Sequence, residues 1–313
     1  MISITEHTPE KHHLSSTELR HRIIAFTMIV IPFSGFIVAV AVSWGHAVDL
    51  PTIAVCGIMY LFTAFGVTMG YHRLFTHKSF TAKRWLKITL AIAGAMAAEG
   101  PLFFWCAMHR RHHQHSDTEY DPHSPHHHGS GVKGILHGVI HSHFGWMLAA
   151  PAADYRKYIP DLLKDRDLIW ISRHYWKWNA LGFAIPAGVL FVIEPSFASL
   201  LKGALWGGLV RIFLLHHATW SVNSLCHMFG SAPFQTKDQS KNNALCAIWS
   251  LGEGWHNNHH AFPTSARHGL TMYQLDPTFI LIKLGSFLGF VTEIKQPSPI
   301  QRISKIIDPN VTE

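Results

Sequence analysis

Two histidine motifs in this sequence have a spacing that suits the binding of metal ions. Residues at positions i, i+3 and i+4 of a helix lie on one face, one turn apart. The H-x-x-H-H motif places three imidazoles at these positions, and the chain contains it twice, as His109, His112, His113 and as His256, His259, His260. Two such helices facing each other could supply ligands to a pair of adjacent metal ions.

Two further pairs carry possible ligands. Asn223 and His227 stand at i and i+4, which is again a same-face spacing. His72 and His77 are five residues apart, and this is not a same-face spacing on an α-helix. We therefore expect the second pair at a helix end or an unwound turn.

The ligand types narrow the choice of metal. Imidazole suits iron, zinc, copper and nickel, and nine histidines with one amide exceed what one ion needs. Glu-x-x-His spacing occurs, for example at Glu10–His13 and Glu253–His256, but not as the pair of motifs on facing helices that soluble di-iron bundles use. The cysteines form no C-x-x-C pair, so we expect no disulfide framework and no metal–thiolate site; they are Cys56, Cys106, Cys226 and Cys246. A binuclear iron site built mainly from histidine fits best, and zinc stays open on ligand type alone.

Other residues receive weaker assignments. His126–His128 lies among Ser, Pro and Gly and is expected in an exposed loop, whereas His216 and His217 are expected to pack between helices. The remaining histidines considered show no comparable pattern: His115, His123, His137, His141, His143, His174 and His268. Three carboxylates beside the motifs either accept from ligand N–H groups or serve for helix capping or solvation, namely Asp117, Asp121 and Glu253. Three tryptophans are expected to pack a core or line a substrate wall: Trp105, Trp220 and Trp255.

The elements that position these residues are apolar helices. Of the 313 residues, 48% are hydrophobic and only 14% are charged, against about 25% charged in a typical soluble domain. This composition excludes a disordered chain and argues against an ordinary soluble enzyme. Four segments approach the roughly 20 apolar residues that a membrane-spanning helix needs: Ile23–Trp44, Leu50–Met69, Trp178–Leu200 and Gly203–Trp220. Turns at Gly45–Pro51 and Glu194–Lys202 make them two helical hairpins.

Charge sets the expected orientation of these hairpins. The segment His72–Lys177 carries fourteen Lys and Arg, and the two hairpin turns together carry one. The positive-inside rule then places both termini and the histidine motifs in the cytoplasm. Shorter apolar stretches are expected to form interfacial or cytosolic cap helices: Leu86–Met108, Gly134–Ala150 and Phe279–Val291. The net charge of +7 suits an anionic membrane surface, an acidic partner or a phosphate-bearing substrate.

We therefore expect an all-α integral membrane protein with one domain, residues 1–313. Its parts are an N-terminal tail (1–21), a first hairpin (22–71), a cytosolic cap (72–177), a second hairpin (178–222), and further cap with a C-terminal tail (223–313). The acidic residues Glu6, Glu10 and Glu18 before the first apolar run do not fit a cleaved signal peptide.

The four histidine segments resemble those of the membrane acyl-CoA delta-9 desaturases, the stearoyl-CoA desaturase family. Three histidine boxes alone also occur in alkane hydroxylases, sterol desaturases and carotenoid oxygenases. Two segments are more specific: Gly-Glu-Gly-Trp-His-Asn-Asn-His-His at 252–260 and Asn-Ser-Leu-Cys-His-Met-Phe-Gly at 223–230. The similarity runs in order from the first apolar span to about Asp276.

The resemblance implies a site, a fold and an activity. It implies two iron ions, with Asn223 reaching one of them through water and with nine histidine ligands: His72, His77, His109, His112, His113, His227, His256, His259 and His260. It also implies a four-span bundle with a cytosolic cap and a tunnel for the acyl chain. The implied reaction uses O2 and two electrons to introduce a cis double bond, at delta-9, into a saturated long-chain acyl-CoA.

Partners and alternatives follow from the same comparison. No His-Pro-Gly-Gly motif follows residue 260, so we expect the bacterial type without a fused haem domain. Electrons then come from a separate ferredoxin, rubredoxin or haem protein with its reductase; membrane lipid is a partner and nucleic acid is not. Two enzymatic alternatives stay open, a desaturase of phospholipid-bound chains and a related di-iron lipid hydroxylase. A histidine-rich metal transporter is disfavoured, because transporters place ionisable ligands near mid-membrane and these motifs lie at span ends.

Overall fold

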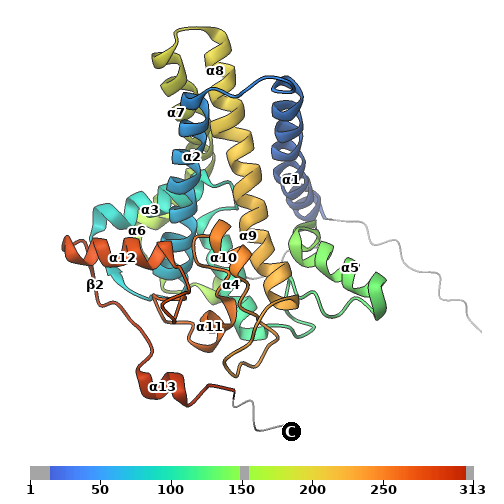
Figure 1. The fold of residues 1–313 in the computed structure, drawn as a ribbon, viewed down its shortest axis with the longest axis vertical. Coiled ribbons are helices and arrows are strands. Elements are labelled where there is room, and N and C mark those ends of the chain that lie inside the picture. The colour runs from blue at the N-terminus through green and yellow to red at the C-terminus, as the bar shows by residue number, and fades with distance from the viewer. Residues whose placement is uncertain (1–14, 149–154, 308–313) are drawn as a thin grey trace, which may run out of the picture.

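The structure, a computed structural model, describes residues 15–148 and 155–307 and is almost entirely helical (Figure 1). Within these described residues, four helical runs are long and apolar enough to cross a membrane. They are α1 (Ser16–Val42); α2 (Leu50–Phe65) continued by the π-helix η1 (Gly66–Thr76); α7 (Tyr175–Ile193); and α8 (Phe197–Gly203) continued by the π-helix η5 (Ala204–Val210) and α9 (Arg211–Met228). The predicted class, an all-α protein with four candidate spans, is confirmed.

The long helices begin at residues that cap them. Ser15 and Glu18 form a capping box at α1, and Asp49 accepts from the Thr52 N–H at the start of α2. The third predicted span, Trp178–Leu200, is wrong at its end. α7 stops at Ile193, and Ser196 then caps α8, so the fourth run begins at Phe197 rather than Gly203. Pro195 cannot continue a helix, and the apolar residues after it belong to the next one.

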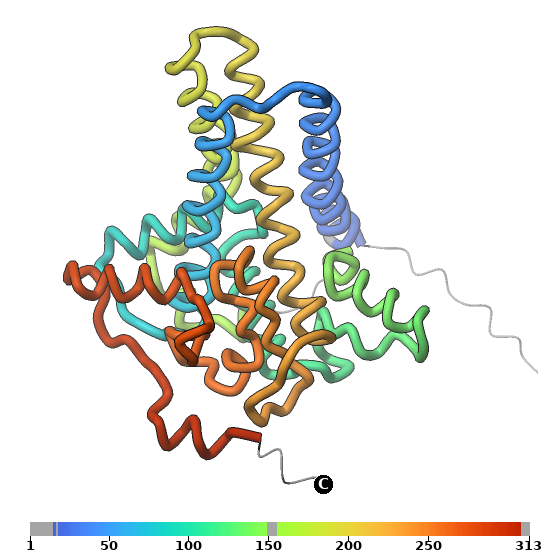
Figure 2. Tube along the Cα trace, in the orientation of Figure 1, coloured from blue at the N-terminus to red at the C-terminus, as the bar shows by residue number. Residues whose placement is uncertain are grey.

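Both hairpin turns lie at one end of the molecule, and the cap lies at the other (Figures 1 and 2). The start of α1 and the C-terminal helix α13 (Pro299–Ile303) are both at the cap end. This arrangement is the predicted pair of hairpins. The predicted tail at residues 1–21 falls largely outside the described residues, as does the end of the Gly134–Ala150 stretch.

A small residue allows the two arms of the second hairpin to approach closely. A Cβ added to Gly207 would meet the Pro186 Cβ at 2.2 Å, so the η5 backbone packs directly on α7. Beside this contact Arg211 is fully buried, and its guanidinium donates to the carbonyls of Met96, Gly182 and Gly207. A buried guanidinium is tolerated only when its donors find acceptors. Arg211 thereby fastens α9 to α7 and to the cap.

The cap consists of shorter helices that surround the cap ends of the long ones. They are α3 (Arg84–Met96), α4 (Leu102–His115), α5 (Gly131–His143), α6 (Arg166–Arg173), α10 (Ala244–Trp249), α11 (His256–Ala261) and α12 (Pro277–Phe287), with 3-10 turns at Gly145–Leu148, Arg156–Tyr158 and Leu162–Lys164. Strands β1 (Thr81–Ala82) and β2 (Val291–Thr292) pair antiparallel, with Thr81 opposite Thr292. The weaker apolar stretches therefore form cap helices, as predicted, and Leu86–Met108 is interrupted at Glu99–Pro101.

A buried apolar cluster holds η1 against α4. Tyr71 and Phe75 of η1 pack with Leu102 and Cys106 of α4, and Ile171 of α6 belongs to the same cluster. The four cysteines of the chain are free and buried. This core fixes the two elements that carry His72 and the first H-x-x-H-H motif.

Candidate metal centre

The π-helix η1 brings His72 and His77 together. The His77 N–H donates to the His72 carbonyl at 3.1 Å, an i to i+5 bond, and the two ring centroids are 4.8 Å apart. A π-helix places residues five apart on one face, and such segments are frequent at functional sites. The expected unwound turn is therefore a wider helical turn.

Nine histidines gather into two groups, in each of which the facing ring nitrogens lie within 4.8 Å of one another. The first group is His72, His77, His109, His113 and His259. The second group is His112, His227, His256 and His260. Each H-x-x-H-H motif serves both groups, because its i and i+4 histidines join one group and the i+3 histidine joins the other. α4 and α11 do this in opposite senses, so the two groups are adjacent, with the His113 and His260 ring centroids 4.4 Å apart.

The separations between ring nitrogens match those of ligands around one ion. The Nε2 atoms of His113 and His259 are 2.9 Å apart, and those of His227 and His256 are 3.1 Å apart. Two nitrogens bound to one ion at about 2.1 Å lie about 3.0 Å apart at a right angle and about 3.4 Å apart at a tetrahedral angle. Both groups thus have the spacing that a metal ion requires.

Three aspartates orient the second group. Asp121 lies 2.9 Å from the Nδ1 of His112, Asp117 lies 2.9 Å from that of His227, and Asp238 lies 2.7 Å from that of His260. A carboxylate at Nδ1 holds a proton there, which leaves Nε2 with a free lone pair. Asp117 and Asp121 therefore orient histidines, which decides between the two roles that the sequence left open.

The position of the proton on these rings indicates whether the site suits a metal ion. When both rings are neutral, the form that binds metal, with the proton at Nδ1, His112 and His260 face each other through two Nε2 lone pairs at 3.4 Å. Two lone pairs cannot form a hydrogen bond, and both rings are buried, so no solvent separates them. A cation between the nitrogens satisfies both. The donor set therefore fits a metal cofactor.

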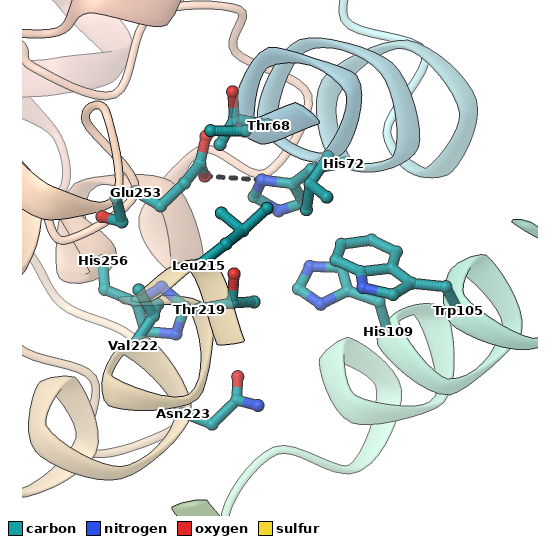
Figure 3. A pocket seen from close by; sticks show the side chains of 13 residues that line it. Thr68, His72, Trp105, His109, Leu215, Thr219, Val222, Asn223, Glu253 and His256 are labelled. Atoms are coloured by element: carbon teal, nitrogen blue, oxygen red, sulfur yellow. Dashed lines mark ion pairs between the residues drawn. The ribbon is translucent and has the colours of Figure 1, made fainter. Parts of the chain in front are cut away.

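Glu253 performs the same task for the first group. Its Oε2 lies 2.6 Å from the Nδ1 of His72 (Figure 3), and Arg73 pairs with its Oε1 at 3.0 Å. Arg73 is fully buried and also pairs with Asp276 at 3.0 Å. Burial alone would raise the pKa of Glu253, but Arg73, His72 and His268 together hold it well below its usual range. Glu253 is thus an ionised carboxylate that accepts from the His72 N–H, the first of the roles expected for it.

Six histidines of the two groups that lie outside the spans are kept neutral. Burial, followed by the fields of neighbouring imidazoles, lowers the pKa of these side chains well below the ordinary value: His77, His109, His113, His256, His259 and His260. Burial acts the same way on His112, but the Asp121 carboxylate outweighs it and raises the pKa of His112. Neutral imidazole is the form that binds metal.

Three residues near the centre were not identified from the sequence. The His268 ring lies 4.5 Å from that of His259, with Nδ1 at 3.1 Å from Glu253. The His123 ring lies 4.3 Å from that of His112, and burial lowers the pKa of His123 to about 3. Asp238 is the third. His123 could have been found from its position two residues after Asp121, whereas Asp238 and His268 follow no spacing rule.

The histidine tract is only partly exposed. His127 is exposed as predicted, but His126 and His128 are half-buried, because the segment folds back on itself. The His128 Nε2 lies 3.1 Å from the Ser124 carbonyl oxygen. His216 belongs to neither group and its Nε2 reaches the Ala97 and Ala98 carbonyls at 3.2 and 3.1 Å, a packing role as expected.

An apolar pocket reaches the histidines. Figure 3 shows His72, His109 and His256 around it, and its other walls include Val67, Leu215 and Val222. Asn223, the tenth predicted site residue, also lines this pocket and belongs to neither histidine group. The arrangement can hold an apolar chain beside a metal centre.

A second pocket shares walls with the first and extends the space towards α1. The shared residues include Trp105, Thr219 and Asn223. Trp105 is stacked on His109, with ring centroids 5.1 Å apart, and donates to Glu99 at 3.1 Å. Thr219 donates to the other oxygen of Glu99 at 2.7 Å. Trp105 is therefore a rigid wall between the pocket and a predicted ligand, and Trp220 lines the second pocket.

Known proteins that resemble this chain in sequence are fatty acid desaturases and a related acetylenase. The fatty acid desaturase family model matches residues 49–279. The hex-5-enoyl-[acyl-carrier protein] acetylenase of Moorena producens is 40% identical over 271 residues, covering 86% of this chain and 84% of that protein. The sn-1 stearoyl-lipid 9-desaturase of a Synechocystis strain is 33% identical, covering 87% of this chain and 81% of that protein. A probable acyl-CoA desaturase of Schizosaccharomyces pombe is 33% identical, covering 85% of this chain and 59% of that protein.

Proposed function

Because the chain belongs to the fatty acid desaturase family, we propose that it introduces a cis double bond at delta-9 into a saturated long-chain acyl-CoA. The observation that carries this proposal is the pair of adjacent histidine groups beside an apolar pocket. An unactivated methylene group is beyond the reach of side-chain acids and bases, so the reaction needs an oxidant assembled at metal ions.

The proposed ligands are the nine histidines of the two groups, with Asn223 acting through water. Two iron ions held there would supply the activation of O2, with two external electrons, that removes two hydrogens from neighbouring carbons. The balance is one saturated chain, one O2, two electrons and two protons, giving one cis alkene and two waters. The number of donors supports two ions rather than one, and iron is the metal that the family resemblance implies.

The protein's own residues position the reactants. Val67, Leu215 and Val222 present apolar surface to the acyl chain and exclude water from it. Trp105, held by its hydrogen bond to Glu99, fixes one wall next to His109. A rigid wall sets which carbons lie nearest the histidines, and this placement decides where the double bond forms.

The carboxylates fix the protons of the ligand rings. Asp117, Asp121, Asp238 and Glu253 each hold a proton at Nδ1 of one histidine, so Nε2 stays unprotonated and aimed inward. This arrangement keeps the ligands in one orientation throughout a catalytic cycle.

Orientation and electron supply belong to the same proposal. The excess of Lys and Arg in the cap supports a cytoplasmic cap, with both termini on that side. One domain, residues 1–313, then carries the whole active site. The electron donor is a separate ferredoxin, rubredoxin or haem protein with its reductase, docking on the cap.

For the acyl carrier, one alternative to CoA has specific support among the relatives. The Moorena relative is described as acting on an acyl-carrier protein substrate, and the Synechocystis relative on a lipid. An acyl-carrier-protein substrate is the second candidate, since that relative is 40% identical. CoA is proposed because this carrier agrees with the motifs at 223–230 and 252–260.

Expression in a host that lacks its own desaturase tests the function. We expect cis-9 monounsaturated chains by gas chromatography of host lipids, with the double-bond position fixed by derivatisation. Feeding purified protein with stearoyl-CoA, the stearoyl carrier-protein thioester or phospholipid then identifies the carrier. A hydroxylated chain would support the lipid hydroxylase instead, and no lipid change in iron-loaded protein supplied with donor would refute the enzymatic proposal.

A further inference from the structure

His268 is a buried histidine beside the candidate metal centre that belongs to neither H-x-x-H-H motif. It lies in the segment between α11 and α12, and its side chain is closed off from solvent. Its ring nitrogens do not converge with those of the five histidines of the first group. They lie instead within reach of the Nδ1 of His72 and the carboxylate of Glu253, the residue that orients the His72 ring. His268 is therefore placed to act on the centre through Glu253.

One oxygen of the Glu253 carboxylate is shared between two imidazoles. Oε2 lies 2.6 Å from the Nδ1 of His72 (Figure 3) and 3.1 Å from the Nδ1 of His268. The other oxygen, Oε1, accepts from two nitrogens of Arg73, at 3.2 and 3.0 Å. An ionised carboxylate has room for donors at both oxygens. Without His268, the contact of Oε2 within the described residues would be only with the ring that it orients.

The main chain of His268 is held in place by two side chains. Its N–H donates to the Oδ2 of Asp276 at 2.8 Å, and its carbonyl accepts from the side-chain amide of Asn258 at 2.8 Å. Asp276 also pairs with Arg73, at 3.0 Å. A closed ring of buried contacts thus runs from Arg73 through Glu253, His268 and Asp276 back to Arg73. In a buried polar network of this kind, each contact supports the geometry of the others.

We propose that His268 is a positioning residue of the metal centre, which holds the Glu253 carboxylate in the orientation that fixes the His72 ring. The proposal rests on the proposed function, since it takes the first histidine group to bind a metal ion. Removing the partner behind a metal-bound histidine usually lowers metal affinity by about 10–100-fold. His268 acts one contact farther from the ligand, so its removal should lower the affinity for one ion by about tenfold, the lower end of that range.

The test is an anaerobic Fe²⁺ titration of the tag-free, metal-free full chain against a chelator of known affinity. We expect His268→Ala to lower one of two iron affinities about tenfold and to leave the other unchanged. His268→Asn should recover most of this loss, because its side-chain amide offers an N–H near the position of Nδ1. The matched control is His216→Ala, which removes another buried histidine, one that contacts backbone carbonyls and belongs to neither group. It should change thermal stability and leave both iron affinities at the wild-type values.

A double-mutant cycle separates positioning from a general loss of packing. In a Glu253→Ala background, His268→Ala should cause no further loss of iron affinity, because the carboxylate through which it acts is absent. Arg73 keeps Asp276 as a partner in that background.

Four results would overturn the role of His268. They are additive losses in the cycle, an equal lowering of both iron affinities by His268→Ala, no change in either affinity, and a loss in His268→Asn as large as in His268→Ala. A wild type that binds no Fe²⁺ would refute the proposed metal centre and this role with it. The desaturase activity itself is tested separately, by the lipid product.

Discussion

Removing the Asp238 carboxylate should weaken the binding of one metal ion, and the structure sets limits on the size of this effect. Asp238 is nearly buried and lies 2.7 Å from the Nδ1 of His260, whose side chain is 1% exposed. A hydrogen bond to a charged group contributes about 1.5–3 kcal/mol, and one between neutral groups about 0.5–1.5 kcal/mol. Asp238→Ala loses the whole bond, whereas Asp238→Asn keeps one acceptor oxygen.

The two substitutions should therefore form a graded series. Asp238→Ala should weaken the free energy of metal binding by roughly 1.5–3 kcal/mol, because the His260 ring is no longer held in its orientation. This corresponds to about 10–100-fold in metal affinity, the usual effect of removing a carboxylate behind a metal-bound histidine. Asp238→Asn loses about 1 kcal/mol, or roughly fivefold. The ligand nitrogen itself is retained, so neither variant should lose metal altogether.

The assay is competition for bound iron against a chelator of known affinity, with anaerobic protein and elemental analysis. Asp167→Asn is the matched control, since Asp167 pairs with the exposed Arg84 and lies in neither histidine group. We expect two iron affinities in the wild type, with only one of them lowered in the Asp238 variants. Equal iron retention in Asp238→Ala and the wild type would refute the role of the carboxylate, and so would an equal loss in Asp167→Asn.

Three further outcomes are expected. His109→Ala, His113→Ala and His260→Ala should each abolish desaturation while membrane insertion persists, whereas His127→Ala should stay near wild-type activity; equal loss in both classes would contradict the assignment of ligands. Burial raises the pKa of Glu99 from 4.5 to about 7, so the free energy of unfolding of the wild type should fall by roughly 1–3 kcal/mol as the pH rises between these two values. Glu99→Gln should not show this fall, and pH–Tm curves that run parallel for the two proteins would contradict the expectation. In intact cells an impermeant maleimide should label His46→Cys in the first hairpin turn and should label Lys133→Cys of the cap only after permeabilisation, since the native cysteines are buried; the reverse pattern would invert the orientation.

Simple periodicity in the sequence predicts which histidines of each H-x-x-H-H motif lie together. His109 with His113 and His256 with His260 are brought together by i and i+4 spacing, and one-turn neighbours stay neighbours in any helix. Periodicity could not show that His112 and His259 point into the opposite group. That crossing depends on how α4 and α11 face each other, which is a tertiary property.

Departures from regular geometry were hidden from the sequence. The spacing of His72 and His77 predicts an irregular turn, because the period of an α-helix is 3.6 residues and a π-helix is not encoded by residue type. The end of α7 was misplaced because Phe197–Leu200 is as apolar as the span before it. The turn signal at Glu194–Ser196 was present but lay inside one apolar run.

For the carboxylates too, the sequence indicated some of the residues and missed another. Asp117, Asp121 and Glu253 were found because they flank the motifs, although their role needed the contacts to His227, His112 and His72. Asp238 lies 22 residues before His260, and only the folded chain brings the two together. Long-range pairs of this kind leave no local pattern.

The most direct test of the central claim is a single-turnover experiment. Tag-free protein with a measured iron content is reduced with two electrons per chain, mixed with stearoyl-CoA and O2, and the product is analysed by gas chromatography. The account predicts two irons per chain and at most one cis-9 alkene for each pair of irons, in proportion to the fully loaded fraction. Protein that contains stoichiometric zinc and forms the same alkene would contradict it.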